Sequence, residues 1–192
     1  MKRFVLGIGG FIGSGKSTVA HYFEKLGAYR INADEVVAQL YEPGAVGYQK
    51  IANFFGDDFV AKDGSLNRKK LAKEVFNDPK KLRILHDLIH PLVTSEIQKL
   101  IDKSSNPFVV IEAIYFEKKY LQRLISALLW VETSKEVAFK RITKSRNLDR
   151  TSYEKIYRIQ IKPESIDYVI TNDGPKKDLG NKVEKLFRSL AV

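Results

Sequence analysis

The sequence predicts an α/β fold built around a parallel β-sheet, and three observations lead to this class. Predicted strands alternate with predicted helices along the 192 residues. The run Phe108 to Glu112, F-V-V-I-E, is apolar and β-branched in the way of a strand buried in a parallel sheet. A glycine-rich turn joins the first strand, Phe4 to Gly9, to a helix, so the backbone can wrap an anion there.

The first half of the chain is expected to hold two short strands and several helices. Gly27 ends the first helix, because glycine readily adopts the left-handed conformation found after helices. Pro91 lies inside a long helical stretch and predicts a kink or break near His90. The expected elements are strands over 4–9 and 29–31, helices over 16–26, from Asp34 to Pro43-Gly44 and over 45–55, a loop into a helix within 55–71, and a long helix over 78–101.

The second half continues the same alternation. Ser134 is a favoured N-cap residue, so a helix is expected to follow it. A polar, basic break is expected at 145–150, before the next helix. The expected elements are strands over 108–112, 127–131 and 168–171, and helices after Ser134, over 151–160 and over about 176–190.

The composition indicates a soluble protein that attracts anions. Lys and Arg total 33 against 23 Asp and Glu, a formal net charge of +10, which suits nucleic acid, a small polyphosphate or simply a Lys-rich solvated surface. The chain has no cysteine, which excludes a disulfide framework and a Cys-based zinc site. No apolar run reaches the length of a membrane span, and glycines interrupt the signal-like N-terminus, so we expect a cytoplasmic protein.

A phosphate-binding loop is the strongest motif in the chain. Gly10 to Ser17 fits G-x-x-x-x-G-K-S/T between a predicted strand and a predicted helix, the context that separates such a loop from a chance match on a glycine-rich turn. Backbone N–H groups and the helix N-terminus would bind phosphate there, with Lys16 reaching the β- and γ-phosphates and Ser17 binding Mg²⁺. The residues expected to hold ATP in this loop are Gly13, Ser14, Gly15, Lys16, Ser17 and Thr18.

Two carboxylates follow predicted strands, and each has an alternative interpretation. Glu112 ends its strand and is a candidate to hold the metal, or it is a solvated strand-end residue. Asp34 lies just past the second strand, where the carboxyl ends of parallel strands face a nucleotide crevice. It can orient a hydroxyl and accept its proton, or it can be the N-cap of the helix that begins there.

A basic segment from Lys140 to Arg150 is a candidate lid. Arg141, Arg146 and Arg150 are spaced for one basic face or loop that could close over phosphates and neutralise their charge. A surface helix with exposed basic side chains is the alternative.

The phosphate loop alone indicates a nucleotide hydrolase, a switch or a kinase. The chain has no N-K-x-D segment, which a switch GTPase would normally show, and it is short for a motor or helicase. A small-molecule kinase needs a base, an acceptor-binding insertion and a mobile basic lid, and the sequence offers a candidate for each.

These residues resemble the dephospho-coenzyme A kinase family over nearly the whole chain. Phe11 stands where the family's loop usually has Gly, Asn32 replaces the first Asp of D-A-D, and Glu112 stands where Asp is frequent. The matching segments are the loop Gly10–Ser17, Asn32-Ala33-Asp34, Glu42-Pro43-Gly44, Phe55-Gly56, Asp63-Gly64-Ser65-Leu66-Asn67-Arg68, Leu71–Phe76, His90-Pro91 and Asp167–Gly174.

The resemblance implies a three-layer P-loop kinase fold with a parallel five-stranded sheet, a helical acceptor-binding region and a lid. It further implies ATP-dependent phosphorylation of the ribose 3′-hydroxyl of dephospho-CoA, with ATP and Mg²⁺ as cofactors. We expect one domain over 1–192, with its core at about 1–35, 105–140 and 165–192, the acceptor-binding region at about 36–104 and the lid at about 141–160.

The resemblance also assigns roles to single residues. Asp34 becomes the base, with Lys16 and Arg141 as its catalytic partners. Arg146 and Asn172 are expected at ATP, with Asn172 near the adenine. The helical region around Arg68 and His90 would hold dephospho-CoA, and the alternative interpretation of His90 is a structural histidine beside Pro91.

Two alternative functions stay open at this point. One is a P-loop kinase that acts on another nucleotide or nucleoside. The other is a basic nucleic-acid-binding ATPase, which only the net charge supports, because no nucleic-acid motif is present. We expect dephospho-CoA as the small-molecule substrate and no nucleic-acid or membrane partner, and no pattern indicates an oligomeric state.

Overall fold

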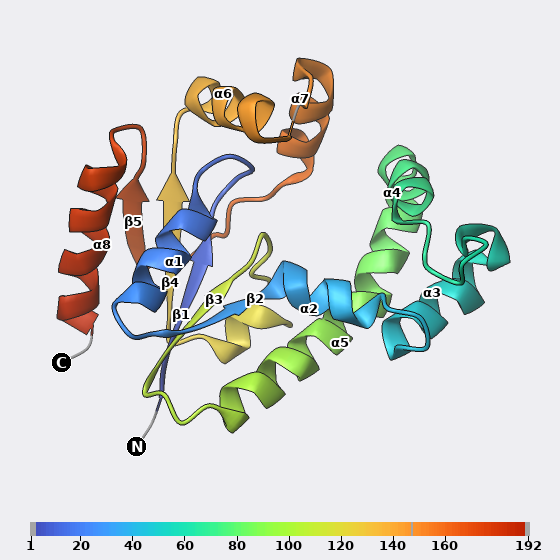
Figure 1. Cartoon of the computed structure of the whole chain (residues 1–192), viewed down its shortest axis with the longest axis horizontal. Coiled ribbons are helices and arrows are strands. Elements are labelled where there is room, and N and C mark those ends of the chain that lie inside the picture. The colour runs from blue at the N-terminus through green and yellow to red at the C-terminus, as the bar shows by residue number, and fades with distance from the viewer. Residues whose placement is uncertain (1–2, 147, 191–192) are drawn as a thin grey trace. The chain divides into compact units, whose positions relative to one another are not determined.

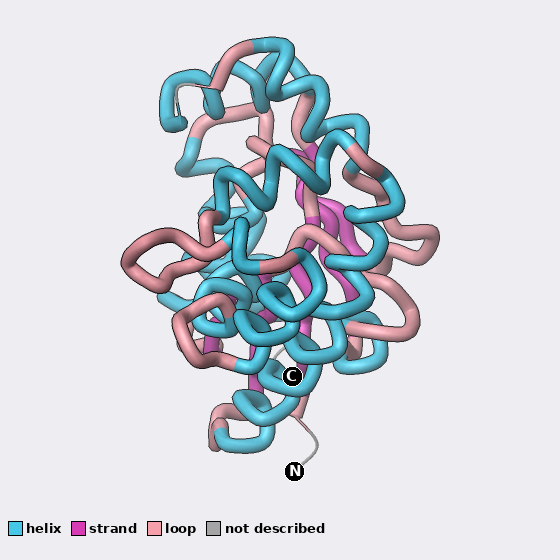
Figure 2. The backbone as a smooth tube through the Cα atoms, turned by 90° about the vertical axis from the view of Figure 1, so that its right-hand side faces the viewer, coloured by secondary structure: helices cyan, strands magenta, loops and turns pink. Residues whose placement is uncertain are grey.

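A computed structural model describes residues 3–146 and 148–190, except for the side chain of Arg146. Five strands lie side by side in one sheet, in the order β2-β3-β1-β4-β5, and every neighbouring pair is parallel (Figure 2). The predicted α/β fold with a parallel five-stranded sheet is therefore confirmed. The strands are β1 (Phe4–Gly9), β2 (Tyr29–Asn32), β3 (Phe108–Glu112), β4 (Ala127–Glu132) and β5 (Tyr168–Thr171).

The helices follow the predicted order, with differences at their ends. The helix after the second strand begins at Ala33, one residue before Asp34, and two short 3₁₀ turns were not expected. The helices are α1 (Lys16–Lys25), α2 (Ala33–Leu40), α3 (Val46–Phe55), α4 (Arg68–Asn77), α5 (Pro79–Lys103), α6 (Lys135–Arg146), α7 (Arg150–Ile159) and α8 (Lys176–Leu190), and the turns are η1 (Asp57–Phe59) and η2 (Leu121–Leu124).

The sheet belongs to a compact unit formed by Met1–Asn32 and Lys103–Val192. Helices α1 and α8 cover one face of the sheet, and apolar side chains from both helices and from the strands form the core between them (Figure 1). On the opposite face, Phe116 lies so close to β1 that a Cβ atom at Gly7 would be 2.7 Å from its ring. Burial of these apolar surfaces is what holds strands and helices together.

The register of the strands brings the candidate site to one edge of the sheet. Glu112, the last residue of β3, pairs with Ile8 of β1 on one side and with Asn32 of β2 on the other. The phosphate loop follows β1, and Asn172 follows β5. All of these residues therefore lie at the carboxyl ends of parallel strands, where α/β proteins bind their ligands.

Residues Ala33–Asp102 form a second compact unit, made of α2 to α5. Of the kink or break predicted near His90, only the break is wrong, because α5 runs as one helix from Pro79 to Lys103 with Pro91 inside it. Proline removes one backbone hydrogen bond, and a helix tolerates this loss by bending; α5 bends along its length in Figure 1. The division of the chain into core, acceptor-binding region and lid stays a prediction.

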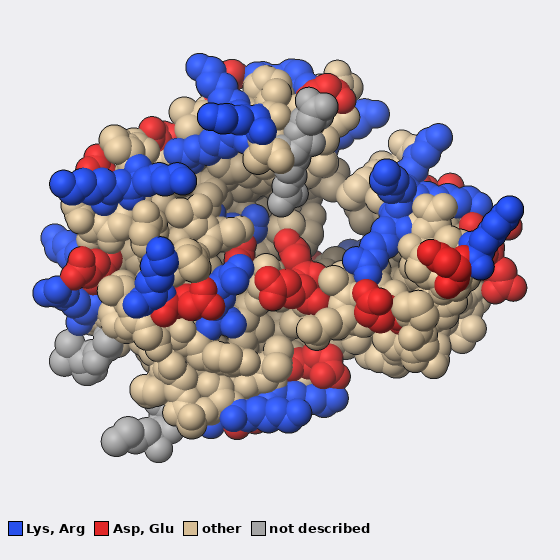
Figure 3. Space-filling view, in the orientation of Figure 1, with Lys and Arg blue, Asp and Glu red and all other residues tan. Residues whose placement is uncertain are grey.

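Charged residues of both signs cover the surface. Figure 3 shows Lys and Arg side chains interspersed with Asp and Glu over the visible face. In the described part of the chain, no helix is both long and apolar enough to cross a membrane.

Candidate functional site

The loop between β1 and α1 has a backbone that requires glycine at two positions. Gly13 and Gly15 adopt positive φ angles of 80° and 91°, which residues with a Cβ atom rarely adopt. A Cβ atom at Gly13 would lie 2.6 Å from the carbonyl oxygen of Ala138, and one at Gly15 would clash with the side-chain amide of Asn172. The predicted glycines of the loop therefore fit both the conformation and the space that the loop has.

The loop ends at the N-terminus of α1, which can bind an anion. Lys16, Ser17 and Thr18 form the first turn of the helix, and this turn contains no acidic residue. Gly15, before the helix, offers no side chain to cap its N–H groups. The uncapped amides and the positive end of the helix dipole suit phosphate, as the sequence predicts.

A buried carboxylate is held beside the first turn of α1. The Ser17 hydroxyl donates a hydrogen bond to Glu112 Oε1. Arg30 Nη2 lies 2.9 Å from Glu112 Oε2, and only 3% of the Glu112 side chain is exposed. A charge buried this far from water needs a partner, and the guanidinium of Arg30 supplies it.

Ser17 and Glu112 are the residues predicted to hold a metal, and their arrangement fits Mg²⁺. Within residues 3–146 and 148–190, no group of three or more His, Asp or Glu side chains is placed to hold an ion. A Mg²⁺ ion usually takes one or two protein oxygens and completes its shell with phosphate oxygens and water. The hydroxyl and carboxylate at the phosphate loop match that pattern.

Asn172 ties the loop after β5 to the phosphate loop. Its side-chain amide donates to the carbonyl oxygen of Ser14 at 2.7 Å, and its carbonyl oxygen accepts from Thr133 Oγ1 at 2.6 Å. Arg141 Nη1 donates to the same Thr133 hydroxyl at 3.3 Å and lies 3.9 Å from the Cβ position of Gly15. The structure thus brings Asn172 and Arg141 to the phosphate loop.

The other two basic residues of the predicted lid differ from Arg141. Arg150 forms a two-pronged ion pair with Glu136, at 3.0 and 2.6 Å, and its Nε lies 3.3 Å from Glu154. This hydrogen bonding holds the pKa of the Glu136 carboxyl below its ordinary value. Arg150 therefore joins α6 to α7, whereas the side chain of Arg146 lies outside the described part of the chain.

Asp34 is an exposed carboxylate in the first turn of α2. Because the helix begins at Ala33, Asp34 is its second residue, so the N-cap interpretation of Asp34 is wrong. Its charge still lies at the positive end of the helix dipole. The Asp34 carboxylate is thus exposed to solvent just after the carboxyl end of β2.

The segment D-G-S-L-N-R builds the start of α4. Gly64 has a φ angle of 79°, and Asp63 Oδ1 accepts hydrogen bonds from both the amide and the hydroxyl of Ser65, at 3.0 and 2.7 Å. Asn67 then caps the helix, because its Oδ1 accepts from the Lys70 amide at 3.0 Å. The motif therefore fixes the start of α4 at Arg68, the first residue of the helix.

Arg68 contacts the end of α2. Its Nη2 donates to the carbonyl oxygen of Ala38 at 3.1 Å and to Glu42 Oε1 at 3.2 Å, and its guanidinium lies 5.6 Å from the centre of the Tyr41 ring. Burial raises the pKa of Tyr41 to about 12, and the charge of Arg68 opposes this rise. The side chain of Arg68 is nevertheless 49% exposed.

His90 stacks on His86 one turn earlier in α5, with ring centres 3.5 Å apart. Its carbonyl oxygen accepts from Thr94 Oγ1 at 2.8 Å. These contacts suit a histidine that stabilises the bend at Pro91 and also one that presents its ring edge to a ligand. Both interpretations from the sequence remain open.

Comparison with known proteins identifies the family. The model of the dephospho-CoA kinase family matches residues 4–178. The chain belongs to this family. Dephospho-CoA kinases from Aquifex aeolicus and from Escherichia coli K12 are 35% and 34% identical to it, over 99% and 96% of this chain and 98% and 91% of theirs.

Solved structures agree with that assignment. A dephospho-CoA kinase from Campylobacter jejuni is 25% identical with a TM-score of 0.66, over 97% of this chain and 96% of the other. A Thermus thermophilus protein of known crystal structure is 27% identical with a TM-score of 0.84, over 99% of both chains. A shikimate kinase from Acinetobacter baumannii, at 19% identity and a TM-score of 0.55, shares the P-loop kinase fold.

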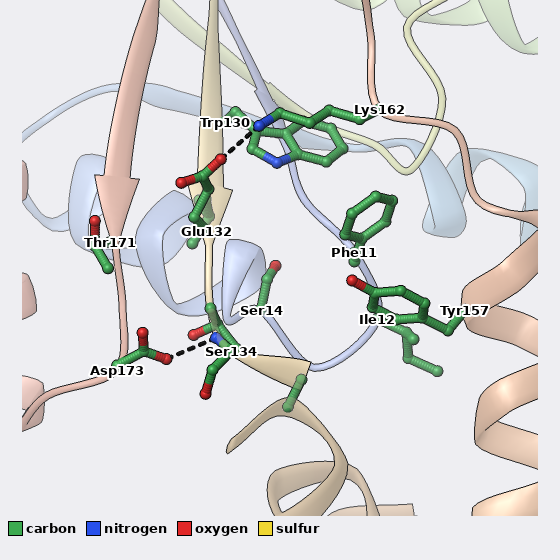
Figure 4. A pocket seen from close by; sticks show the side chains of 13 residues that line it. Phe11, Ile12, Ser14, Trp130, Glu132, Ser134, Tyr157, Lys162, Thr171 and Asp173 are labelled. Atoms are coloured by element: carbon green, nitrogen blue, oxygen red, sulfur yellow. Dashed lines mark hydrogen bonds and ion pairs between the residues drawn. The ribbon is translucent and has the colours of Figure 1, made fainter. Parts of the chain in front are cut away.

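Phe11 departs from the usual glycine of the dephospho-CoA kinase loop, and the structure shows where its side chain lies. The ring packs edge-on against Trp130, with centres 5.3 Å apart, and against Tyr157 at 4.8 Å (Figure 4). These residues line a cavity of about 310 Å³ next to the loop. Glu132 and Lys162, which form an ion pair with a Lys162 Nζ to Glu132 Oε1 distance of 2.5 Å, also line it. The ring thus occupies space beside the loop, as expected for a large residue there.

Three residues that contact this kinase site were not predicted from the sequence. Arg30 pairs with Glu112, Thr133 joins Arg141 to Asn172, and Gln160 Oε1 accepts the Ile12 amide at 2.8 Å. Arg30 alone gives a signal in the sequence, because a cation inside a short strand between Tyr29 and Ile31 requires a partner. Thr133 and Gln160 are ordinary polar residues, and only the fold brings them to the loop.

Proposed function

We infer that this chain transfers the γ-phosphoryl group of ATP to the ribose 3′-hydroxyl of dephospho-CoA and so forms coenzyme A and ADP. The match of residues 4–178 to the dephospho-CoA kinase family carries this inference. The glycine geometry of the loop and the uncapped N-terminus of α1 support it, since both suit a nucleoside triphosphate.

We propose that the donor is held by Gly13 to Thr18, with Lys16 at the β- and γ-phosphates. Mg²⁺, when bound, would neutralise charge on those phosphates. Ser17 and Glu112 would hold it, with Arg30 fixing the orientation of the Glu112 carboxylate. Arg141, whose guanidinium lies beside Gly15, would stabilise the charge that spreads over the transferring phosphoryl group.

On the acceptor side, we propose Asp34 as the base. It would accept a hydrogen bond from the 3′-hydroxyl and then take its proton, as a new O–P bond forms and the bond between the γ-phosphorus and the bridging oxygen of ATP breaks. ADP leaves with the electron pair of that bridging oxygen. The exposure of Asp34 just after the carboxyl end of β2 supports this role, because parallel sheets bind ligands at that edge.

The remaining assignments are proposals as well. Arg68 and His90 would bind dephospho-CoA, Asn172 would lie near the adenine of ATP, and Arg146 would contact ATP from the lid at about 141–160. A helical region at about 36–104 would receive the acceptor. We also propose a cytoplasmic enzyme without nucleic-acid or membrane partners.

One assay tests the proposed function. Purified protein with ATP and Mg²⁺ should release ADP and form coenzyme A only when dephospho-CoA is added. A panel of other nucleosides and nucleotides, each at the same concentration, serves as the control for acceptor choice. The assignment fails if no coenzyme A forms, or if another acceptor is phosphorylated faster than dephospho-CoA.

A further inference from the structure

We propose that Gln160 is a positioning residue of the nucleotide site, which holds the first half of the phosphate loop through its side-chain carbonyl. The role of ATP in this inference rests on the proposed function. Gln160 follows α7 directly and lies 148 positions from the residue that it contacts, Ile12. The loop is thus fixed by a segment outside the loop motif.

The hydrogen bond from Ile12 is the first contact. The Ile12 amide donates to Gln160 Oε1 at 2.8 Å, and only 8% of Ile12 is exposed. This amide belongs to the loop motif but points at a protein acceptor instead of the phosphate side. The Ser14 amide donates to the Phe11 carbonyl oxygen at 3.0 Å and closes the turn. The amides of Ile12 and Ser14 are therefore used to shape the loop itself.

The second contact is aromatic and comes from the same end of α7. Tyr157, three residues before Gln160, packs on Phe11, which in turn lies edge-on against Trp130 (Figure 4). Aromatic pairs at these separations are attractive beyond the area they bury. Phe11 and Ile12 are thus held by neighbouring positions of one segment.

The third contact extends the attachment to α6. Ile12 belongs to a buried apolar cluster with Ala138 and Ile142 of α6 and Tyr153 of α7. Lys135 Nζ lies 2.6 Å from Glu154 and 5.0 Å from the centre of the Tyr157 ring, which joins the two helices. The α6–α7 pair and the first half of the loop therefore form one packed body, and its geometry sets the position of Gly13 and Gly15 for phosphate.

This arrangement predicts a specific pattern of kinetic effects. An unbonded Ile12 amide would let the first half of the loop sample other conformations, and ATP binding would have to select the correct one. Affinity for ATP should fall, whereas turnover of bound ATP should change little, because Gln160 contacts no reacting atom. A residue important only for folding would not separate these two quantities.

The experiment compares three variants of the full chain. Gln160→Met removes the acceptor at similar size, Gln160→Glu keeps an acceptor oxygen, and Gln122→Met makes the same change at a glutamine of η2, outside both the loop motif and α7. Trp130 is the single tryptophan of the chain and packs on Phe11, so its fluorescence reports ATP binding at the loop. The dissociation constant of ATP, the KM for ATP, kcat and the melting temperature are measured for each.

We expect Gln160→Met to weaken ATP binding by about 10-fold, the size expected for one lost hydrogen bond, with kcat within about 3-fold of the original protein. Gln160→Glu should lie closer to the original protein, and Gln122→Met should match it. Unchanged ATP binding in Gln160→Met, equal losses in Gln160→Met and Gln160→Glu, or a fall in kcat alone would overturn the proposal. If Gln160→Met does not fold, Tyr157→Leu tests the second contact between this segment and the loop, the one to Phe11, and should also weaken ATP binding without lowering kcat.

Failure of this inference and failure of the proposed function give different results. ATP titrations followed by Trp130 fluorescence need no acceptor. If the protein binds ATP but forms no coenzyme A, the proposed function is contradicted. The ATP titration of Gln160→Met then still tests the positioning role of Gln160. A protein that forms coenzyme A, with normal ATP binding in Gln160→Met, contradicts the positioning role alone.

Discussion

The phosphate loop and the candidate acceptor residues are held in place by different kinds of contact. The loop is fixed by partners far away in the chain, since Ser14 binds a side chain 158 positions away and Ser17 one 95 positions away. His90, in the helical unit, stacks on His86 of the same helix, and Arg68 bonds to Glu42, 26 positions away. The donor side is thus preformed by the fold of the sheet, whereas the acceptor residues depend on contacts within or between neighbouring helices.

This difference has a consequence for mutations. A change at the loop disturbs contacts that also hold strands and helices together, so it should affect both ATP binding and stability. A change at an exposed acceptor residue should affect turnover or acceptor affinity and leave the fold intact. Three substitutions test this distinction, in order of the expected loss of activity.

Asp34→Asn should have the largest effect on activity. The amide keeps the shape of the carboxylate but cannot take the proton of the 3′-hydroxyl, so kcat should fall by about 10²- to 10⁴-fold, the usual contribution of general base catalysis. The dissociation constant of ATP should stay within about 2-fold, because the residue is not part of the phosphate loop. Coenzyme A formation under saturating substrates measures the first quantity, and Trp130 fluorescence measures the second.

Glu35→Gln is the matched control for that prediction, because it removes one charge from the next position of the same helical turn. It should keep nearly full activity. Equal kcat in Asp34→Asn and the original protein, together with a lower melting temperature, would show that Asp34 only stabilises the start of α2.

Much of the fold could be predicted from the sequence, because its strands are short apolar runs between glycines, prolines and polar turns. The bounds of β1, β3, β5 and α8 agree with the predicted ones to the residue. The start of α2 was missed because Ala33 and Asp34 both suit a first helical turn, and local preference does not choose between them. At Pro91 the sequence left a kink and a break open, and the helix continues because tertiary packing of a long helix outweighs one lost hydrogen bond.

Only those residues of the candidate site that belong to a local sequence motif could be predicted. The glycines, Lys16 and Ser17 follow from a local pattern that has one structural solution. Arg30, Thr133 and Gln160 become part of the site through pairing of β2 with β3 and through the return of the chain after β4 and α7. No spacing rule connects residues that are 82 or 148 positions apart, so only the structure reveals these contacts.

Glu112→Gln should have the next largest effect, and here stability should fall together with activity. The change leaves the Arg30 guanidinium, only 20% exposed, without its anionic partner, and a broken buried ion pair typically costs about 3–5 kcal/mol. Coenzyme A formation should fall by about 10- to 100-fold, with a need for more Mg²⁺, because the metal loses a charged ligand. Denaturant titration measures stability, and Mn²⁺ binding followed by electron paramagnetic resonance measures the metal site.

The double substitution Arg30→Met with Glu112→Gln separates these two effects. It removes both charges, so most of the lost stability should return, whereas metal binding should stay weak. Recovery of metal binding in the double variant would contradict the assignment of Glu112 to the metal.

Arg68→Met should have the smallest effect and should be confined to the acceptor. Its exposed ion pair with Glu42 contributes about 0–1 kcal/mol to stability, so the melting temperature should change little. If its guanidinium binds a phosphate of dephospho-CoA, the KM for dephospho-CoA should rise by about 10-fold, the loss expected for one charge-assisted hydrogen bond. The KM for ATP and kcat should be unchanged.

Lys69→Met removes the same charge from the next position of α4 and should leave the KM for dephospho-CoA nearly as it is. An equal rise in both variants would mean that the general positive charge of α4, and not Arg68 itself, attracts the acceptor, and no rise in either would limit Arg68 to its contact with the end of α2.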